Sequence, residues 1–597
     1  MDCAANDGGW LDYDEGMKFW FRLAVISSCV WSAWAQPASI SGTLTSAADA
    51  SPAAHKSALD AALFYQLLVG ELSVRSGSPG SGFSIILDAA RKTRDPALFQ
   101  RAVDLALQSR SGDAALQAAQ AWKKALPKAT EANRYLLQIL LALNKINEAG
   151  QALATSIADL PESEKNSAIA SVPRVFARVI DKKMAADTVE KALSASLQKT
   201  TTAATSWTTI GRMRREAGQL SLAIEATRRG LAADPLAPGP IILALSLAGA
   251  APTDMAPLLA QAMQADVDPE LRLGYARHLI GLPQSAQALH QLSRLNKDHP
   301  NFADGWMVHG LFLQEIGKWA EAEQYLLRYI ELTPSSNNNG QTSGLAEALM
   351  ALAQIAQRQG QLKQAEQWLA QVPGNADPIK LASRQADLLS RQGRIEEAQQ
   401  VLASIPTSNA EQATRKVLAQ SMWLRDHQKA SEAYRLVKQA LSEQVQNTDL
   451  MAELAMLSEK LKRFDEMESL LRELMQRKPD DPHAFNALGY SLADRNTRLD
   501  EARQLITQAL TLAPKDAYIQ DSLGWVVYRQ GQHAEALQIL RTAYKARPDA
   551  EIAAHLGEVL WVMGQRQEAT DIWREGLLLK SDNETLQETL RRFQFKP

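Results

Sequence analysis

The sequence predicts an all-α protein built from repeated pairs of helices. Three observations lead to this fold class. A pattern of small residues recurs every 33 to 35 residues over most of the chain, helical runs end at regularly placed glycines, and strand-like alternation is nearly absent. The chain has 597 residues, more than a single hydrophobic core usually serves, so an array of units is expected.

The first 57 residues stand apart from this array. Residues 1–16 contain five acidic side chains and no basic one, whereas the chain from Met17 reads "MKFWFRLAVISSCVWSAWA". A basic start, an apolar stretch and Ala-Trp-Ala before Gln36 are typical of a secretory signal. We therefore interpret 1–16 as an upstream extension, 17–35 as a signal peptide and 36–57 as a flexible tether. A buried N-terminal helix is the alternative.

A second cleavage position lies inside the signal. Ile26-Ser27-Ser28-Cys29 loosely resembles a lipobox, which would leave Cys29 as a lipidated N-terminus. Arg22 interrupts the short apolar segment, so soluble export is favoured over lipidation. Either route takes the protein out of the cytoplasm. We expect the periplasm of a bacterial envelope, with a lipid anchor in the outer membrane as the alternative.

The repeat is clearest in residues 210–235, 309–334, 523–548 and 556–581. Each segment has a glycine in its first helix, a second glycine seven residues later and an alanine five residues after that. Proline closes the unit, except that Ser581 replaces it in the last one. The structural positions assigned in this way are Gly211, Gly310, Gly317, Ala322, Gly489, Gly524, Gly531, Ala536, Gly557, Gly564 and Ala569.

Each of these residue types has a physical reason. The first glycine allows the first helix (helix A) to approach the second (helix B) closely. The second glycine ends helix A in a left-handed conformation. The alanine keeps helix B close to its neighbours, and proline begins the next unit after the helix has stopped. One unit cannot bury its apolar stripe alone, so the units should stack into a solenoid.

This scheme resembles the tetratricopeptide repeat (TPR) family, which has a 34-residue period. The resemblance implies a helix–turn–helix solenoid with a right-handed superhelix. We expect partly degenerate TPR-like repeats over 58–235 and central repeats over 236–334. Repeats follow a polar loop over 335–479, and regular repeats occupy 480–597. The polar loop is "PSSNNNGQTSG" (334–344), and the consensus is poor at 162–206 and 236–267.

Catalytic chemistry is not expected. The chain has no GxSxG, GxxxxGK[ST] or GxGxxG motif in a suitable context. The nine histidines are scattered, and the two cysteines both precede residue 30, so neither a metal site nor another cofactor is predicted. A net charge of −3 gives no electrostatic footprint for nucleic acid. We expect a non-enzymatic protein that binds protein or peptide partners.

The resemblance also implies where a partner binds, because helix A lines the concave groove of TPR arrays. Aligned on the first glycine, a row of aromatic residues falls on groove positions near the C-terminus, edged by polar residues. The row is Tyr490, Trp525, Tyr528 and Trp561, and its edge is Asn486, Asp521, Arg529 and Glu558. The alternative is that these aromatics pack between adjacent A helices. Arg212 and Arg215 hold groove positions in an earlier unit, where they would meet either an acidic segment or only solvent.

A narrower resemblance comes from "FYQLLVGELSVRSG" near the start and from "DAYIQDSLGWVVYRQGQ" and "DAEIAAHLGEVLWVMGQ" near the end. These phrases are similar to long proteobacterial envelope TPR proteins, which include the outer-membrane lipoprotein partner of a carboxyl-terminal processing protease. The resemblance implies an envelope scaffold that holds a protease and its substrates. The alternatives are a subunit of an outer-membrane assembly or polysaccharide-export machine and an enzyme with TPR substrate docking.

Overall fold

The computed structural model describes residues 60–282, 284–333 and 339–595. The predicted upstream extension, signal peptide, tether and Cys29 lie outside these residues. Over the described part of the chain every regular element is helical, and the all-α prediction is confirmed. The chain divides into two compact units, described here as 60–351 and 352–595, and the division falls inside one long helix.

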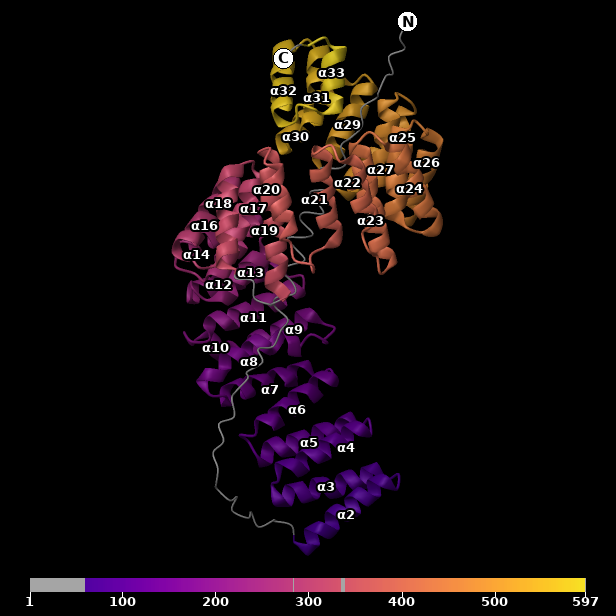
Figure 1. The fold of residues 1–597 in the computed structure, drawn as a ribbon. Helices are drawn as coiled ribbons and strands as arrows, with labels where there is room; N and C mark the ends of the chain where they lie inside the picture. The colour runs from indigo at the N-terminus through magenta and orange to yellow at the C-terminus, as the bar shows by residue number, and fades with distance from the viewer. Residues whose placement is uncertain (1–59, 283, 334–338, 596–597) are drawn as a thin grey trace. The chain divides into compact units, whose positions relative to one another are not determined.

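The N-terminal unit runs from helix α2 to the first part of α19 (Figure 1). Its helices are α2 (Ala61–Arg75), α3 (Pro79–Thr93), α4 (Pro96–Gln108), α5 (Gly112–Ala125), α6 (Thr130–Ala142), α7 (Ile146–Asp159), α8 (Glu162–Val175), α9 (Lys182–Ala192), α10 (Ser194–Leu197), α11 (Ala203–Glu216), α12 (Leu220–Ala233), α13 (Pro238–Leu247), α14 (Pro252–Ala262), α15 (Pro269–Ile280), α16 (Ser285–Asp298), α17 (Ala303–Glu315), α18 (Trp319–Leu332) and α19 (Asn339–Arg358).

The C-terminal unit contains the remainder of α19 and the helices that follow it. These are α20 (Leu362–Ala370), α21 (Pro378–Arg391), α22 (Ile395–Ala403), α23 (Ala410–Asp426), α24 (Ala430–Glu443), α25 (Thr448–Lys460), α26 (Phe464–Arg477), α27 (Pro482–Asp494), α28 (Leu499–Leu512), α29 (Ala517–Arg529), α30 (His533–Ala546), α31 (Ala550–Val562), α32 (Arg566–Leu579) and α33 (Glu584–Arg592).

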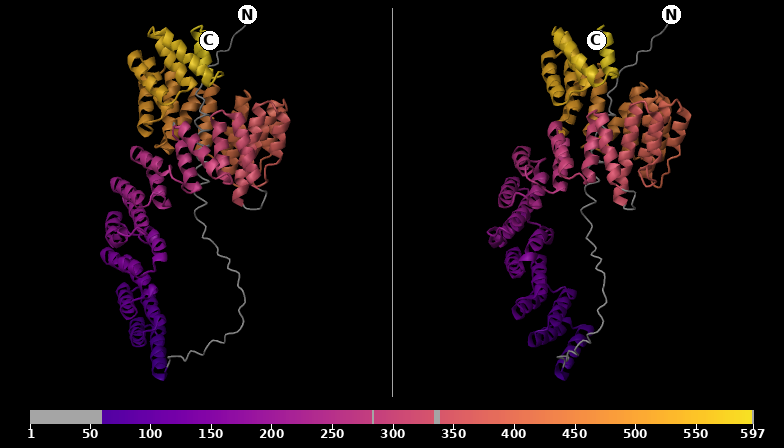
Figure 2. Two further views of the ribbon diagram at one scale, coloured as in Figure 1. Left: turned by 90° about the vertical axis from the view of Figure 1, so that its left-hand side faces the viewer. Right: turned by 60° about the vertical axis from the view of Figure 1, so that its left-hand side comes forward.

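Most helices pair in chain order within each unit, and each pair packs on the next, whereas α8 packs mainly on α11 and α9 packs on α7 and α11. The pairs with the most extensive contacts between their helices are α2–α3, α11–α12, α17–α18, α27–α28, α29–α30 and α31–α32. Both views in Figure 2 show the helices of the N-terminal unit following one another along the chain. The stretches with a poor consensus also form helices, namely α8 to α10 and α13 to α14. The chain is therefore helical beyond the residues that carry the consensus.

The predicted roles of the two glycines are confirmed. Gly317, Gly531 and Gly564 follow their A helices with φ of 80°, 82° and 81°, a left-handed conformation that side chains other than glycine rarely adopt. The first glycine of each unit is required because helix A packs closely against helix B at that position. A methyl group added at Gly524 would lie 2.6 Å from Cγ of Leu540, and one at Gly557 would lie 2.1 Å from Nε1 of Trp573. Only glycine permits this approach of helix A to helix B.

Helix starts and the repeat alanines follow from the sequence in the same way. Asp516 caps α29 by accepting hydrogen bonds from the backbone amides of Tyr518 and Ile519, which have no partner within the helix. Ala322, Ala536 and Ala569 are completely buried, as expected for residues that keep helix B close to its neighbours. Local capping and small-residue packing together set the boundaries of each pair.

One prediction about the connections is wrong. The polar residues 334–344 are predicted to form a surface loop or a local hinge, but α19 already begins at Asn339. The residues 334–338 lie outside the described part of the chain. Polar residues with turn propensity can enter a first helical turn when the following segment is strongly apolar, as it is after residue 344.

Candidate partner-binding site

The eight residues predicted to form the groove lie on the A helices of three consecutive pairs. Helix α27 carries Asn486 and Tyr490. Helix α29 carries Asp521, Trp525, Tyr528 and Arg529, and α31 carries Glu558 and Trp561. The structure brings these helices together, and Tyr490 reaches α31, two pairs further along the chain. The three helices appear in orange to yellow in Figure 1.

The predicted exposure of the aromatic row is wrong for its first two members. Tyr490 is 1% exposed and Trp525 is 3% exposed, so neither is presented to solvent. Asn486, Asp521 and Glu558 are buried as well. The alternative, in which Tyr490 and Trp525 pack between A helices, describes their positions. Tyr528, Arg529 and Trp561 stay partly exposed, and a role for them in partner binding remains a prediction.

A buried histidine on α31, His555, organises this cluster. Its Nδ1 lies 2.8 Å from Oδ2 of Asp521, and its ring stacks on Trp525 with centroids 4.3 Å apart. Its Nε2 lies 3.4 Å from the hydroxyl of Tyr490. Burial by itself lowers the pKa of His555, but Asp521, Glu551 and Glu558 outweigh burial and raise that pKa to about 9. His555 is therefore a buried cation that links α27, α29 and α31.

Sequence reasoning missed His555, although a signal was present. Asp521 and His555 are 34 residues apart, one repeat length, which places them on adjoining A helices. An acid and a histidine at that spacing are a candidate inter-repeat pair. The alignment on Gly557 singled out only Glu558 and Trp561 in this unit.

Acidic groups on the same helices have pKa values that burial shifts upward. Burial raises the pKa of Glu558, against the opposing effects of Arg592, His555 and Tyr528. Burial also raises the pKa of Asp494, at the end of α27. The Tyr528 hydroxyl donates to Oε1 of Glu558 at 3.2 Å, and burial together with Glu558 raises the Tyr528 pKa to about 12.

The C-terminal helix α33 adds further contacts to this face. Arg592 forms an ion pair with Glu558, and the Thr585 hydroxyl lies 3.4 Å from Oε1 of Glu551 on α31. Glu584 lies 3.6 Å from Nζ of Lys460, at the end of α25. Side chains of A helices that are two to four pairs apart thus meet directly. The A-helix side of α25–α33 is therefore partly filled by the chain's own side chains.

Trp561 belongs to a separate aromatic cluster at the end of the array. Its ring stacks on Trp573 of α32 at 5.5 Å, and Phe593 lies 6.0 Å from it. The guanidinium carbon of Arg566 lies over the Trp561 ring, 5.2 Å from its centroid. Trp573 is fully buried, so this cluster packs the terminal pair against α33 and the residues after it.

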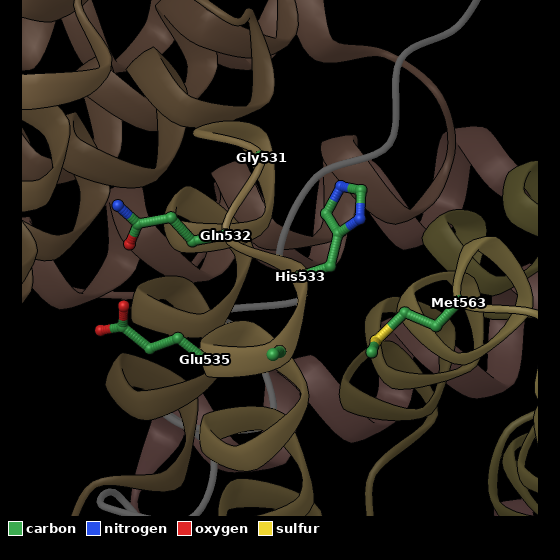
Figure 3. A pocket seen from close by; sticks show the side chains of 6 residues that line it. Gly531, Gln532, His533, Glu535 and Met563 are labelled. Carbon is green, nitrogen blue, oxygen red and sulfur yellow. The ribbon is translucent and has the colours of Figure 1, made fainter.

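An open depression of about 620 Å³ lies beside the turn between α29 and α30. Its lining comes from Gly531 to Glu535 and from Met563 at the end of α31. Figure 3 shows Gln532 and Glu535 on one side of α30, with His533 and Met563 on the other. The depression is shallow and open to solvent, which is more suitable for a protein side chain than for an enclosed small molecule.

The part of the chain that the structure describes contains no group of three or more His, Cys, Asp or Glu side chains arranged to hold a metal ion. Within the same residues, no helix has the length and apolar character required to span a bilayer.

These features define an α-helical repeat protein whose residues 480–595 are held together by a buried polar network. Two family models, both described as tetratricopeptide repeat, match residues 273–337 and 339–588. The helix pairs of these residues, with their glycines and alanines in place, belong to the TPR family. TPR proteins are generally non-catalytic and typically bind protein partners.

Similar proteins cover different parts of the chain. The TPR repeat-containing protein PA4667 of Pseudomonas aeruginosa is 30% identical over 199 residues, which is 33% of this chain and 34% of that protein. The match thus spans about a third of that relative. The Thermus thermophilus TPR protein TTC0263 is 20% identical over 30% of this chain and all of its own, with a TM-score of 0.29. The Cut9–Hcn1 assembly of the APC/C is 12% identical over 82% of this chain and 95% of its own, with a TM-score of 0.31.

Proposed function

We propose that this protein is a non-catalytic TPR scaffold of the bacterial cell envelope that holds a carboxyl-terminal processing protease and its substrates. The observation that carries the scaffold role is the array of helix pairs through both units, in which each pair adds surface for a partner. TPR proteins typically bind proteins, which supports the same role. The resemblance of the phrases near both ends of the chain to envelope TPR proteins supports the choice of partner.

The proposed compartment follows from the sequence of residues 17–35. A signal peptide there sends the chain to the periplasm, and cleavage after Ala35 leaves the tether at the new N-terminus. Lipidation of Cys29 would instead anchor it to the outer membrane. Mass spectrometry of the mature N-terminus distinguishes the two routes, because cleavage after Ala35 gives an N-terminal Gln36 and lipidation gives a lipid-modified Cys29.

Affinity capture tests the partner. The mature chain is immobilised, exposed to detergent-solubilised envelope extract, and the retained proteins are identified by mass spectrometry against beads that carry the heat-denatured chain. We expect enrichment of a carboxyl-terminal processing protease, followed by direct binding of the purified protease in solution. Recovery of outer-membrane assembly or polysaccharide-export subunits instead would favour that alternative, and equal recovery on the denatured chain would refute the scaffold.

A further inference from the structure

The A-helix side of the N-terminal unit carries arginines that form no ion pair with any residue that the structure describes. Arg174 lies at the end of α8, and Arg212 and Arg215 lie at the end of α11. None of the three guanidinium groups has a hydrogen bond or ion pair with any residue that the structure describes. Arg174 and Arg215 are exposed, and Arg212 is half-buried. The unpaired charge therefore lies on a surface that a partner can reach.

The two helices present these arginines at equivalent places. Ile169 and Val172 are the buried apolar residues of α8, and Ile210 and Met213 are their counterparts on α11. Each of the exposed arginines Arg174 and Arg215 follows the second residue of its pair by two positions. Helices α8 and α11 are in direct contact, because the Thr209 hydroxyl donates to the carbonyl of Ile169 at 3.0 Å.

Other arginines on α11 and on its partner helix α12 form ion pairs. Arg214, also on α11, forms ion pairs with Asp187 and Glu190 of α9, both at 2.5 Å. On α12, Arg228 pairs with Asp254 at 2.6 Å and Arg229 pairs with Glu225 at 2.8 Å. Counter-ions are therefore supplied on the other sides of α11 and α12 but are missing from the A-helix side.

The absence of an ion pair at these arginines, among the described residues, leaves a local cost. Arg212 and Arg215 are three residues apart on one helix and so face the same way. Burial lowers the pKa of Arg212, the neighbouring charge of Arg215 lowers it further, and the nearby Glu216 offsets only part of this lowering. Two positive charges held close together are destabilising, and a carboxylate bound directly to them would relieve that repulsion.

We infer that the A-helix side of α8 and α11, defined by Arg174, Arg212 and Arg215, binds an acidic segment of a partner protein. The inference rests on the proposed scaffold function and names the chemistry of one partner segment. A guanidinium matches a carboxylate in a two-point geometry, which favours Asp or Glu over an uncharged side chain. Packed helix axes lie roughly 9 Å apart, which an extended chain covers in about three residues. The fitting segment therefore carries an acid at every third position.

The probe is a fluorescein-labelled peptide with glutamate at every third position in a Gly/Ser background, and its control has glutamine at those positions. Binding to the mature full-length chain is followed by fluorescence anisotropy at two salt concentrations. We expect the glutamate peptide to bind and the glutamine peptide to bind at least tenfold more weakly, with affinity falling as salt rises.

Matched variants locate the site. Arg212→Gln with Arg215→Gln should weaken binding at least tenfold, and Arg174→Gln should weaken it less. Arg228→Gln with Arg229→Gln removes the same charge from α12 and should change the affinity less than twofold. Circular dichroism and melting temperatures of the variants show whether the fold is retained.

Several outcomes would overturn the inference. These are equal affinity for the two peptides, an equal loss in the α11 and α12 variants, or tighter binding of a thymidine oligonucleotide or of phosphatidylglycerol vesicles than of the glutamate peptide. The scaffold function is judged separately. If the protease is still captured but the glutamate peptide does not bind, the acidic-segment site is refuted and the scaffold function is retained. If the peptide binds but the protease is not captured, the scaffold function is refuted and the acidic-segment site is retained.

Discussion

Replacing His555 with leucine tests whether a single buried cation holds three helix pairs together. The substitution keeps an apolar side chain on α31 but removes the group that faces Asp521 at 2.8 Å and Tyr490 at 3.4 Å. Asp521 is completely buried, and its other oxygen, Oδ1, has no hydrogen-bond partner among the described residues. Its carboxylate therefore depends on His555, and the variant leaves a buried charge without compensation.

Two independent arguments give the size of the effect. Breaking a buried ion pair by removing one partner costs roughly 3–5 kcal/mol. The pKa of His555 is raised from 6.5 to about 9, and at about 1.4 kcal/mol per pKa unit this corresponds to roughly 3 kcal/mol. We therefore expect the opening free energy of α29 and α31 to fall by about 3 kcal/mol or more at pH 7.

The assay is hydrogen exchange of the full chain, followed by mass spectrometry of peptides from α29 and α31. A local readout is required because long repeat arrays do not always unfold as one cooperative unit. Peptides from α4 and α5 serve as an internal control and should not change. A second variant combines His555→Leu with Asp521→Asn, which removes the stranded charge and should recover part of the loss. A cost below about 1 kcal/mol, or no recovery in the double variant, would refute the reasoning.

Three further predictions concern the same region. The pKa of His555 is raised in the folded state, so protonated His555 stabilises the fold fully below pH 6.5, and this stabilisation is lost as the pH rises through about 9. The melting temperature of the wild type should therefore fall more between pH 7 and 9.5 than that of His555→Leu. Gly557→Ala places a methyl group 2.1 Å from Nε1 of Trp573 and should lower the free energy of unfolding in urea by about 1–3 kcal/mol. Gly531 has a φ of 82° and open space around it, so Gly531→Asn should lower that free energy by less than about 1 kcal/mol. Arg592→Gln removes the ion pair of the buried Glu558 and should lower the opening free energy of α33 by about 1–3 kcal/mol. Hydrogen exchange in α33 should then be faster, and unchanged exchange there would contradict the role of this contact.

Much of the fold follows from local sequence. Gly317 and Gly531 end their helices with positive φ because a left-handed residue is required at that point whatever surrounds it. Gly524 and Gly557 face the B helix of their own pair, so the requirement for glycine at these positions also arises within one repeat. These positions recur with the period of the repeat, which is why they can be recognised without a structure.

The candidate site shows where such reasoning stops. The alignment correctly placed Tyr490, Trp525 and Trp561 on A helices, but it gave no measure of how closely those helices approach one another. Tyr490 is covered by Glu551 and His555, which lie more than 60 residues away. Burial of this kind depends on distant pairs, so neither the periodicity nor the residue type predicts it.

The sequence by itself determined the class of helical repeat, the boundaries of most helix pairs and the residues that pack each pair. Tertiary structure decided which A-helix surfaces are available. Each pair adds a small rotation to the one before it, and the sum over several pairs brings α25, α27, α31 and α33 into contact in the C-terminal unit. In the N-terminal unit, Arg174 and Arg215 stay exposed and form no ion pair within the part of the chain that the structure describes. No single repeat encodes that sum, and for this reason only the folded chain shows which side chains of the A helices are buried and which stay exposed.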